Sequence, residues 1–89
     1  MAQIEVKKQG PETFAVMVTA NTTTAHTVTL KHDYYQKLAG GKVSPEKLIE
    51  KSFEFLLERE NNTSVLPRFD LPVIARYFPE FEKIIVGRL

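Results

Sequence analysis

The stretch from Ser44 to Glu60, SPEKLIEKSFEFLLERE, constrains the fold more than any other part of the chain. Ser44 is a good helix N-cap because its hydroxyl can accept a hydrogen bond from a first-turn amide, and Pro45 suits the first helical position, where no amide donor is needed. At 100° per residue, the apolar positions of this stretch cover an arc of roughly 200°. A helix with so wide an apolar arc must be covered from more than one side.

The composition is that of an ordinary folded chain. Of the 89 residues, 43% are hydrophobic and 26% are charged, which favours a globular structure over a disordered one. A chain of this length predicts a single domain over residues 1–89, and such a domain buries only about 60–65% of the surface that its unfolded chain exposes. We therefore expect a modest stability, or one that is shared with a partner.

Several functional classes are disfavoured by what the chain lacks. It has no cysteine, which excludes disulfides and thiolate metal sites and favours a reducing compartment. The first residues, MAQIEVKKQG, contain no signal-peptide core, and no apolar run is long enough to cross a membrane. We therefore expect a cytoplasmic protein without membrane contacts. Twelve basic and eleven acidic residues give a net charge of +1, which is unlike the strongly basic balance of a typical nucleic-acid-binding domain.

Residues 1–31 predict a β-meander. Apolar and polar residues alternate over 4–7 and again over 14–19, and the turn residues Gly10-Pro11-Glu12 separate these two stretches. A third alternating stretch ends near residue 30. The simplest topology is an antiparallel meander with one face buried against the 44–60 helix. That face consists of Ile4, Val6, Phe14, Val16, Val18, Val28 and Leu30.

Residues 32–60 predict a short helix and then the central helix. Asp33 can cap the short helix over 34–39, and Gly40-Gly41 ends it. The periodicity thus changes from 2 in the first third of the chain to 3.6 in the middle third, which indicates an α+β protein.

Residues 61–89 predict C-terminal helices. Residues 65–67 predict a single turn, Asp70 can cap a helix that Pro79 interrupts, and the apolar residues that follow predict one or two further turns. Taken together, the sequence predicts an α+β domain in which a three-stranded antiparallel β-meander is followed by three or four α-helices.

Residues with catalytic or metal-binding chemistry do not form a known pattern. The six-residue spacing of His26 and His32 matches no zinc signature. The loop at Gly40-Gly41 lacks the spacing of a phosphate-binding loop, and the serines lie in no nucleophile pattern. We therefore expect a protein that is not an enzyme and that holds neither a metal nor a cofactor.

The segment LPRFDLPVIARYFPEFEKII is rich in aromatic residues and arginine. This composition is typical of binding hot spots, and it makes Arg68, Arg76, Tyr77 and Phe81 the candidate partner-binding residues. The alternative is that the aromatic side chains close the underside of a small core. Both can hold if the arginines rim a partly buried aromatic cluster.

From Thr27 to Glu60 the chain resembles ribbon–helix–helix repressors and antitoxins, in which an alternating strand precedes two helices. The resemblance implies that Thr27, Thr29 and Lys31 face outward and read DNA bases, while amides near Ser44 hold a phosphate. Over its whole length, the chain is similar to small bacterial proteins of unknown function that have a strand-rich first half and a helical second half ending in an LPVIARYFPE-like segment. This second resemblance implies no activity.

The functional hypothesis is a non-enzymatic protein-interaction or regulatory module, and the alternative is a nucleic-acid-binding regulator or antitoxin of the ribbon–helix–helix type. We also expect self-association as a symmetric homodimer, because the apolar arc of the central helix needs more cover than three strands supply. Edge pairing of the third strand or contact between helices would each supply this cover, and the aromatic C-terminal segment favours the contact between helices.

Overall fold

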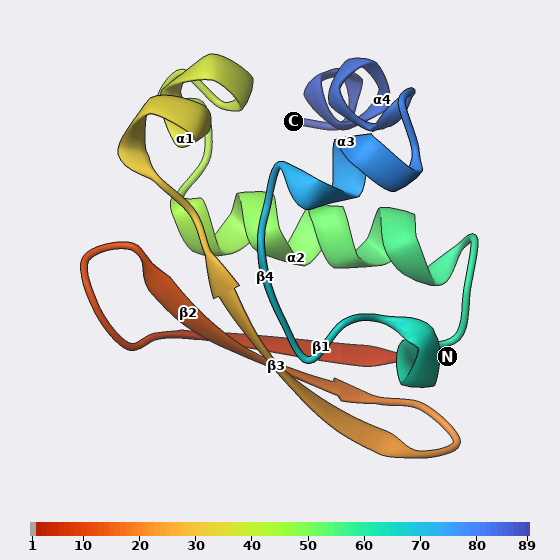
Figure 1. Cartoon of the computed structure of the whole chain (residues 1–89). Helices are drawn as coiled ribbons and strands as arrows, with labels where there is room; N and C mark the ends of the chain where they lie inside the picture. Colours follow the sequence, from red (N-terminus) through yellow and green to blue (C-terminus); the bar gives the residue numbers. More distant parts are fainter. Residues whose placement is uncertain (1) are drawn as a thin grey trace.

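The computed structural model describes residues 2–89 and shows an α+β architecture in three layers (Figure 1). A β-sheet forms the first layer and helix α2 (Pro45–Leu57) forms the second. Helices α1 (His32–Leu38), α3 (Val73–Tyr77) and α4 (Phe81–Gly87) form the third. Helix α2 therefore has strands on one side and helices on the other, which confirms that its wide apolar arc is covered from more than one side.

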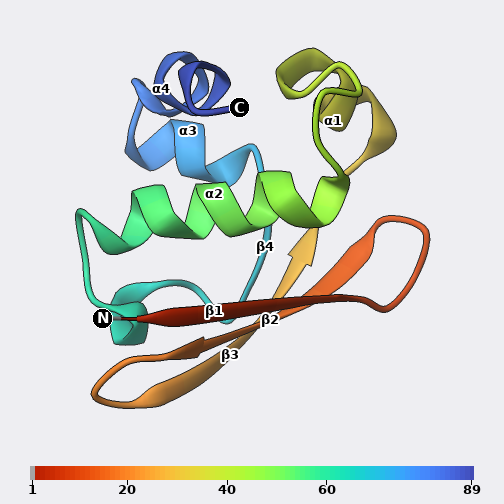
Figure 2. The same ribbon diagram turned by 180° about the vertical axis from the view of Figure 1, so that it is seen from behind.

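The sheet contains strands β1 (Gln3–Lys8), β2 (Thr13–Thr19), β3 (Thr23–Thr29) and β4 (Arg68–Asp70), in the order β1-β2-β3-β4 (Figure 2). The first three strands form the predicted antiparallel meander, but β3 and β4 are parallel. The prediction of a three-stranded, wholly antiparallel sheet is therefore wrong. β3 and β4 are parallel because α1 and α2, which connect them, return the chain to the start of β3. A crossover connection of this kind yields a parallel pair.

The two faces of the sheet differ in cover. On the face toward α2, the predicted apolar residues of β2 and β3, together with Leu30, expose at most 3% of their surface, while Ile4 and Val6 of β1 are half-buried. Side chains alternate between faces along a strand, so threonines and Met17 lie on the opposite face. Met17 exposes 48% of its surface. The sheet thus buries one face and leaves the other open.

Helix α2 forms as its sequence predicts. The Lys47 amide donates a hydrogen bond to Ser44 Oγ at 3.1 Å, and Pro45 is the first helical residue. Phe53 and Phe55 are both fully buried but lie against different layers. The Phe53 ring centroid lies 6.0 Å from that of Phe69 on the sheet side, whereas the Phe55 ring centroid lies 5.2 Å from that of Phe81 on the helix side.

Helix α1 differs from its prediction at its start. It begins at His32 with Lys31 as the N-cap, and Asp33 lies inside the first turn without capping it. The helix ends as expected, because Gly40 and Gly41 adopt φ values of 55° and 83°, which side-chain-bearing residues rarely adopt.

The C-terminal third differs in two local details. The predicted turn over 65–67 is instead a 3-10 helix, η1 (Asn62–Ser64), followed by an extended segment. Asp70 ends β4 and does not cap α3, whose N-cap is Pro72. A strand between two prolines is too short to show an alternating pattern, and a capping interpretation of Asp70 was therefore the one that the sequence favoured.

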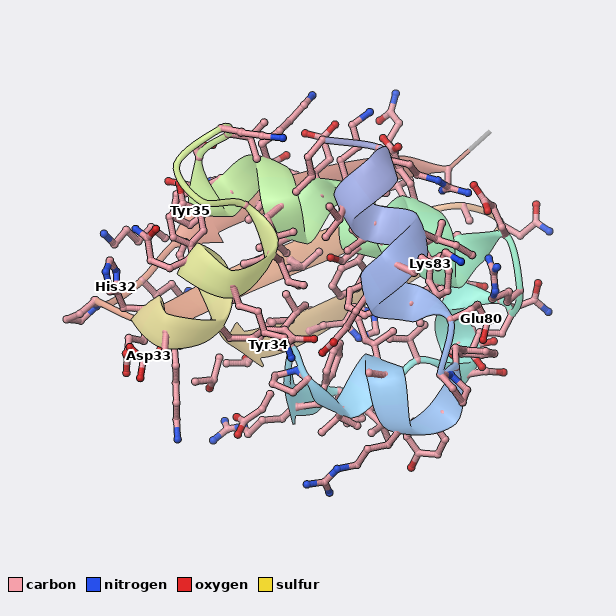
Figure 3. The ribbon with its side chains drawn as sticks, turned by 90° about the horizontal axis from the view of Figure 1, so that it is seen from above. His32, Asp33, Tyr34, Tyr35, Glu80 and Lys83 are labelled. Atoms are coloured by element: carbon pink, nitrogen blue, oxygen red, sulfur yellow. The ribbon has the colours of Figure 1, made fainter. Side chains whose placement is uncertain are left out.

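Hydrogen bonds and ion pairs hold the third layer together. Tyr34 lies on the side of α1 that faces α4, as Figure 3 shows, and its hydroxyl donates to Glu82 Oε2 at 2.8 Å. Lys37 Nζ lies 3.1 Å from the other oxygen of Glu82. Burial raises the pKa of the Tyr34 hydroxyl, and its hydrogen bond to Glu82 raises it further. The hydrogen bond from Tyr34 and the nearby Lys37 lower the pKa of Glu82.

Candidate functional site

An open groove of about 420 Å³ lies between the end of α2, the connection from η1 to β4, and helix α3. Its floor is apolar and buried, since Val65, Phe69 and Ile74 expose at most 8% of their surfaces. Its rim is apolar and exposed, with 42% of Leu66 and 67% of Tyr77 accessible. The remaining lining residues are Leu56, Glu60, Ser64, Val73 and Phe78.

Asn62 holds one wall of this groove in place. Its side chain is buried, and Nδ2 donates hydrogen bonds to the Thr22 carbonyl at 2.8 Å and to Thr24 Oγ1 at 3.0 Å. Both acceptors lie in or beside the β2–β3 hairpin. Moving the backbone of Asn62 would break these bonds and leave the buried amide unpaired, which is costly. The bonds therefore fix the backbone at this residue. The start of the 62–67 connection is therefore attached to the sheet.

His26 fixes the other end of the same connection. The ring is buried, Nδ1 donates to the Leu66 carbonyl at 2.8 Å, and Nε2 lies 2.8 Å from Thr24 Oγ1. A carbonyl can only accept, so Nδ1 carries the proton of the bond to Leu66, and in that tautomer Nε2 accepts from Thr24. Because the backbone of Leu66 is held in this way, its side chain is presented at the rim of the groove.

The four predicted partner-binding residues are not brought together. Arg76 and Tyr77 are neighbours on α3 and are exposed, and Tyr77 forms part of the groove rim. Arg68 is exposed on β4, where it alternates with the inward-facing Phe69 and so lies on the open face of the sheet. Phe81 is fully buried against Phe55. The prediction that Phe81 binds a partner at the surface is therefore wrong, because Phe81 lies in the core.

The burial of Phe81 weakens one reason for expecting contact between helices of two chains, while Tyr77 of the same segment stays exposed. The ring of Phe55 packs against Phe78 at 5.9 Å as well as against Phe81, and the Arg59 guanidinium lies over the Phe55 ring, 3.7 Å from its centre. The aromatic C-terminal segment therefore covers this side of α2 within one chain, as the alternative interpretation of the sequence proposed.

Other residues of the groove were not identified from the sequence. The sequence placed Leu66 in a turn and Val73 in a helix. Leu66 did carry a signal, because an apolar residue before a proline is typical of extended backbone. Phe69 lies within the aromatic-rich segment but was not predicted to form the floor of a groove. Its place depends on β4, which the sequence did not predict.

The histidines have no metal-binding neighbourhood. Both ring nitrogens of His26 have partners within the chain, and His32 lies exposed at the start of α1, away from the groove (Figure 3). Within residues 2–89, no three His, Asp or Glu side chains lie close enough together to hold a metal ion.

Thr27 and Thr29 of the ribbon–helix–helix alternative lie where β3 has no free edge, and Lys31 follows the strand as the N-cap of α1. β3 pairs with β2 on one side and with β4 on the other, whereas that family uses this strand to pair with a second subunit. Thr27 and Thr29 are half-buried. Thr29 and Lys31 line a hollow of about 290 Å³ that also contains the carboxyl groups of Asp33 and Asp70, so this surface is of mixed charge.

Comparisons with protein-family models, curated proteins and solved structures give no match to this chain. In the described part of the chain, residues 2–89, no helix has the length and apolar character that crossing a bilayer requires.

Proposed function

We propose that this protein is a small, non-enzymatic interaction module that binds an apolar segment of a partner protein in the groove between α2 and α3. The observation that carries the proposal is an exposed apolar rim, formed by Leu66 and Tyr77, above a buried apolar floor. Aromatic and aliphatic side chains exposed together beside a concave surface are typical of binding sites.

The size of the groove and the charge of Arg76 beside it define the partner segment. A volume of about 420 Å³ is within the range of pockets that enclose a few bulky groups. Arg76 adjoins Tyr77, is exposed, and has no ion pair with any carboxylate of residues 2–89. An acidic residue of the partner would complement it. The expected segment therefore carries a bulky apolar side chain close to an Asp or Glu.

The chemistry of the lining supports binding rather than catalysis. Glu60 is the one carboxylate among the lining residues, and no histidine or lysine lines the groove. General acid–base catalysis requires titratable groups placed within hydrogen-bond reach of a reacting atom. The lining instead offers apolar contacts, which suit the capture of a side chain.

Selection of peptides from a random displayed library tests this proposal without knowledge of the partner. We expect the enriched peptides to share a bulky apolar residue beside an acidic one, and to shift the amide signals of the groove residues in nuclear magnetic resonance spectra. Leu66→Ala and Tyr77→Ala should each weaken binding by about tenfold or more, since a hot-spot side chain contributes more than its neighbours.

Met17→Ala is the matched control, because Met17 is an exposed apolar residue on the open face of the sheet, with 48% of its surface accessible. This variant should bind the selected peptides as the unmodified protein does. The proposal fails if no peptides are enriched, or if Tyr77→Ala and Met17→Ala bind them equally well.

A further inference from the structure

The outer edge of β1 is a second surface that can take a partner. β1 ends the sheet, and no strand of residues 2–89 pairs with its outer side (Figure 2). The Gln9 amide donates to the Thr13 carbonyl at 2.8 Å, and backbone groups alternate in direction along an antiparallel strand. The odd-numbered residues of β1 therefore bond to β2, while Ile4, Val6 and Lys8 direct their amides and carbonyls outward.

The charged side chains of β1 restrict what can pair there. Glu5 and Lys7 lie on the open face of the sheet, expose 67% and 75% of their side chains, and contact each other at 3.5 Å within the chain. Exposed charges on an edge strand normally oppose pairing with other strands. They permit it where the incoming strand places opposite charges beside them.

A second β1 strand meets this condition in one register. With a two-fold axis beside Val6, Glu5 lies opposite Lys7 of the second copy, and Lys7 lies opposite its Glu5. An axis beside Glu5 instead pairs two glutamates, and an axis beside Lys7 pairs two lysines. Like charges directly opposite each other destabilise a sheet, so the register centred on Val6 is favoured among the three.

The same register satisfies the backbone and the buried face. It places the outward groups of Ile4 opposite those of Lys8, and the two Val6 residues opposite each other, so each pair can exchange both hydrogen bonds. The odd-numbered pairs are then the closely spaced ones, which brings Glu5 and Lys7 of different copies together. On the inner face, Ile4 and Val6 are half-buried in one chain; the two Val6 side chains meet, and Ile4 lies opposite the aliphatic stem of Lys8 of the second copy.

We propose that two copies of this chain associate through antiparallel pairing of their β1 strands about a two-fold axis beside Val6. This pairing joins the two four-stranded sheets into one continuous sheet and leaves the groove between α2 and α3 accessible on both copies. It differs from the helix-mediated dimer that the sequence predicted, and it does not depend on the peptide-binding function proposed for the groove.

Charge reversal on the open face tests the register. Glu5→Lys and Lys7→Glu each place like charges opposite each other in the homodimer, and each should weaken dimerisation by about tenfold or more. A mixture of these two variants restores opposite charges at both positions and should form a heterodimer. The double variant, which carries both substitutions, should dimerise as the unmodified chain does. Sedimentation equilibrium between about 1 and 100 μM measures each case.

Lys42→Glu is the control for net charge, because Lys42 is exposed and lies far along the chain from the sheet. It should leave dimerisation unchanged. Amide hydrogen exchange provides a second readout, since raising the concentration should protect the outward amides of Ile4, Val6 and Lys8 more than those of Glu5 and Lys7. The proposal is overturned by a monomer at about 100 μM, by a dimer that both single variants preserve, or by single variants that do not associate when mixed.

Discussion

The two sides of helix α2 are covered in different ways. On the sheet side, Phe53 packs against His26 and Phe69, and the strands beneath it pair over seven residues between β2 and β3. On the helix side, Phe55 packs against Phe78, which follows α3, and against Phe81 of α4. Helices α3 and α4 have five and seven residues. Isolated helices shorter than about 12–15 residues are marginal in water, so these helices depend on docking to α2 for their structure.

The links that hold the two sides also differ in chemistry. The sheet side is held by buried bonds of Asn62 and His26, which contain no carboxylate. The helix side is held by carboxylates at its surface, including Glu82 with α1 and Glu58 with Arg88 at 2.8 Å. We therefore expect the helix layer to open locally at a lower free energy than the sheet layer, because its contacts are more exposed to water.

The largest expected effects come from truncating the two phenylalanines of α2. Both are fully buried, so Phe53→Ala and Phe55→Ala should each lower the free energy of unfolding by about 3–5 kcal/mol. In so small a domain this is a large part of the total stability. Chemical denaturation measures the loss, and hydrogen exchange separates the layers. Phe55→Ala should deprotect α4 before the β2–β3 pair, whereas Phe53→Ala should deprotect both.

Tyr77→Ala is the control for these truncations, because Tyr77 exposes 67% of its surface. Its effect on unfolding should stay within about 0.5 kcal/mol. Equal loss of protection throughout the molecule in both phenylalanine variants would show that the two layers unfold as one unit.

A smaller effect is expected for Asn62→Ala, which tests the polar attachment of the sheet side. The substitution removes the donor to the Thr22 carbonyl and to Thr24 and should cost about 1–3 kcal/mol, the range for a buried polar group that loses its partner. Denaturant titration measures this cost. The neighbouring Asn61→Ala is the control, since Asn61 is exposed. Similar losses in the free energy of unfolding for the two variants would mean that the buried bonds of Asn62 do not stabilise the sheet side.

The sequence predicted the features that depend on local periodicity and capping. The Ser44 cap and the central helix follow from residues within a few positions of one another, and so does the apolar face of the meander. The end of the helix was placed at Glu60 but lies at Leu57, followed by turns. Helix ends fray, and their position depends on contacts beyond the helix.

The features that the sequence did not predict depend on distant partners. β4 has three residues between Pro67 and Pro72 and becomes a strand because β3 pairs with it. Asn62 resembles a turn residue in sequence, but its partners lie about 40 positions away. Phe81 did carry a signal, since Phe81, Ile84 and Ile85 fall on one helical face, which is typical of a core position.

The smallest expected effect is a loss of stability in acid that depends on Glu82 of the helix layer. The Tyr34 hydrogen bond and Lys37 hold the pKa of Glu82 below its usual range. A carboxylate whose pKa is lowered by folding stabilises the fold above its unfolded pKa, and this contribution is lost as the pH falls through the folded pKa. Because Glu82 is partly exposed, the contribution should stay below about 1 kcal/mol.

Glu82→Gln isolates this contribution. The free energy of unfolding of the unmodified protein should exceed that of the variant by a constant amount above about pH 5, and the difference should shrink toward zero in acid. Tyr34→Phe removes one of the two links to Glu82 and should reduce the acid dependence only in part. In hydrogen exchange, acid should deprotect α1 and α4 before the sheet, because carboxylates link these two helices while the buried bonds of Asn62 and His26 contain none. A difference between the two proteins that does not change with pH would show that Glu82 acts through packing alone.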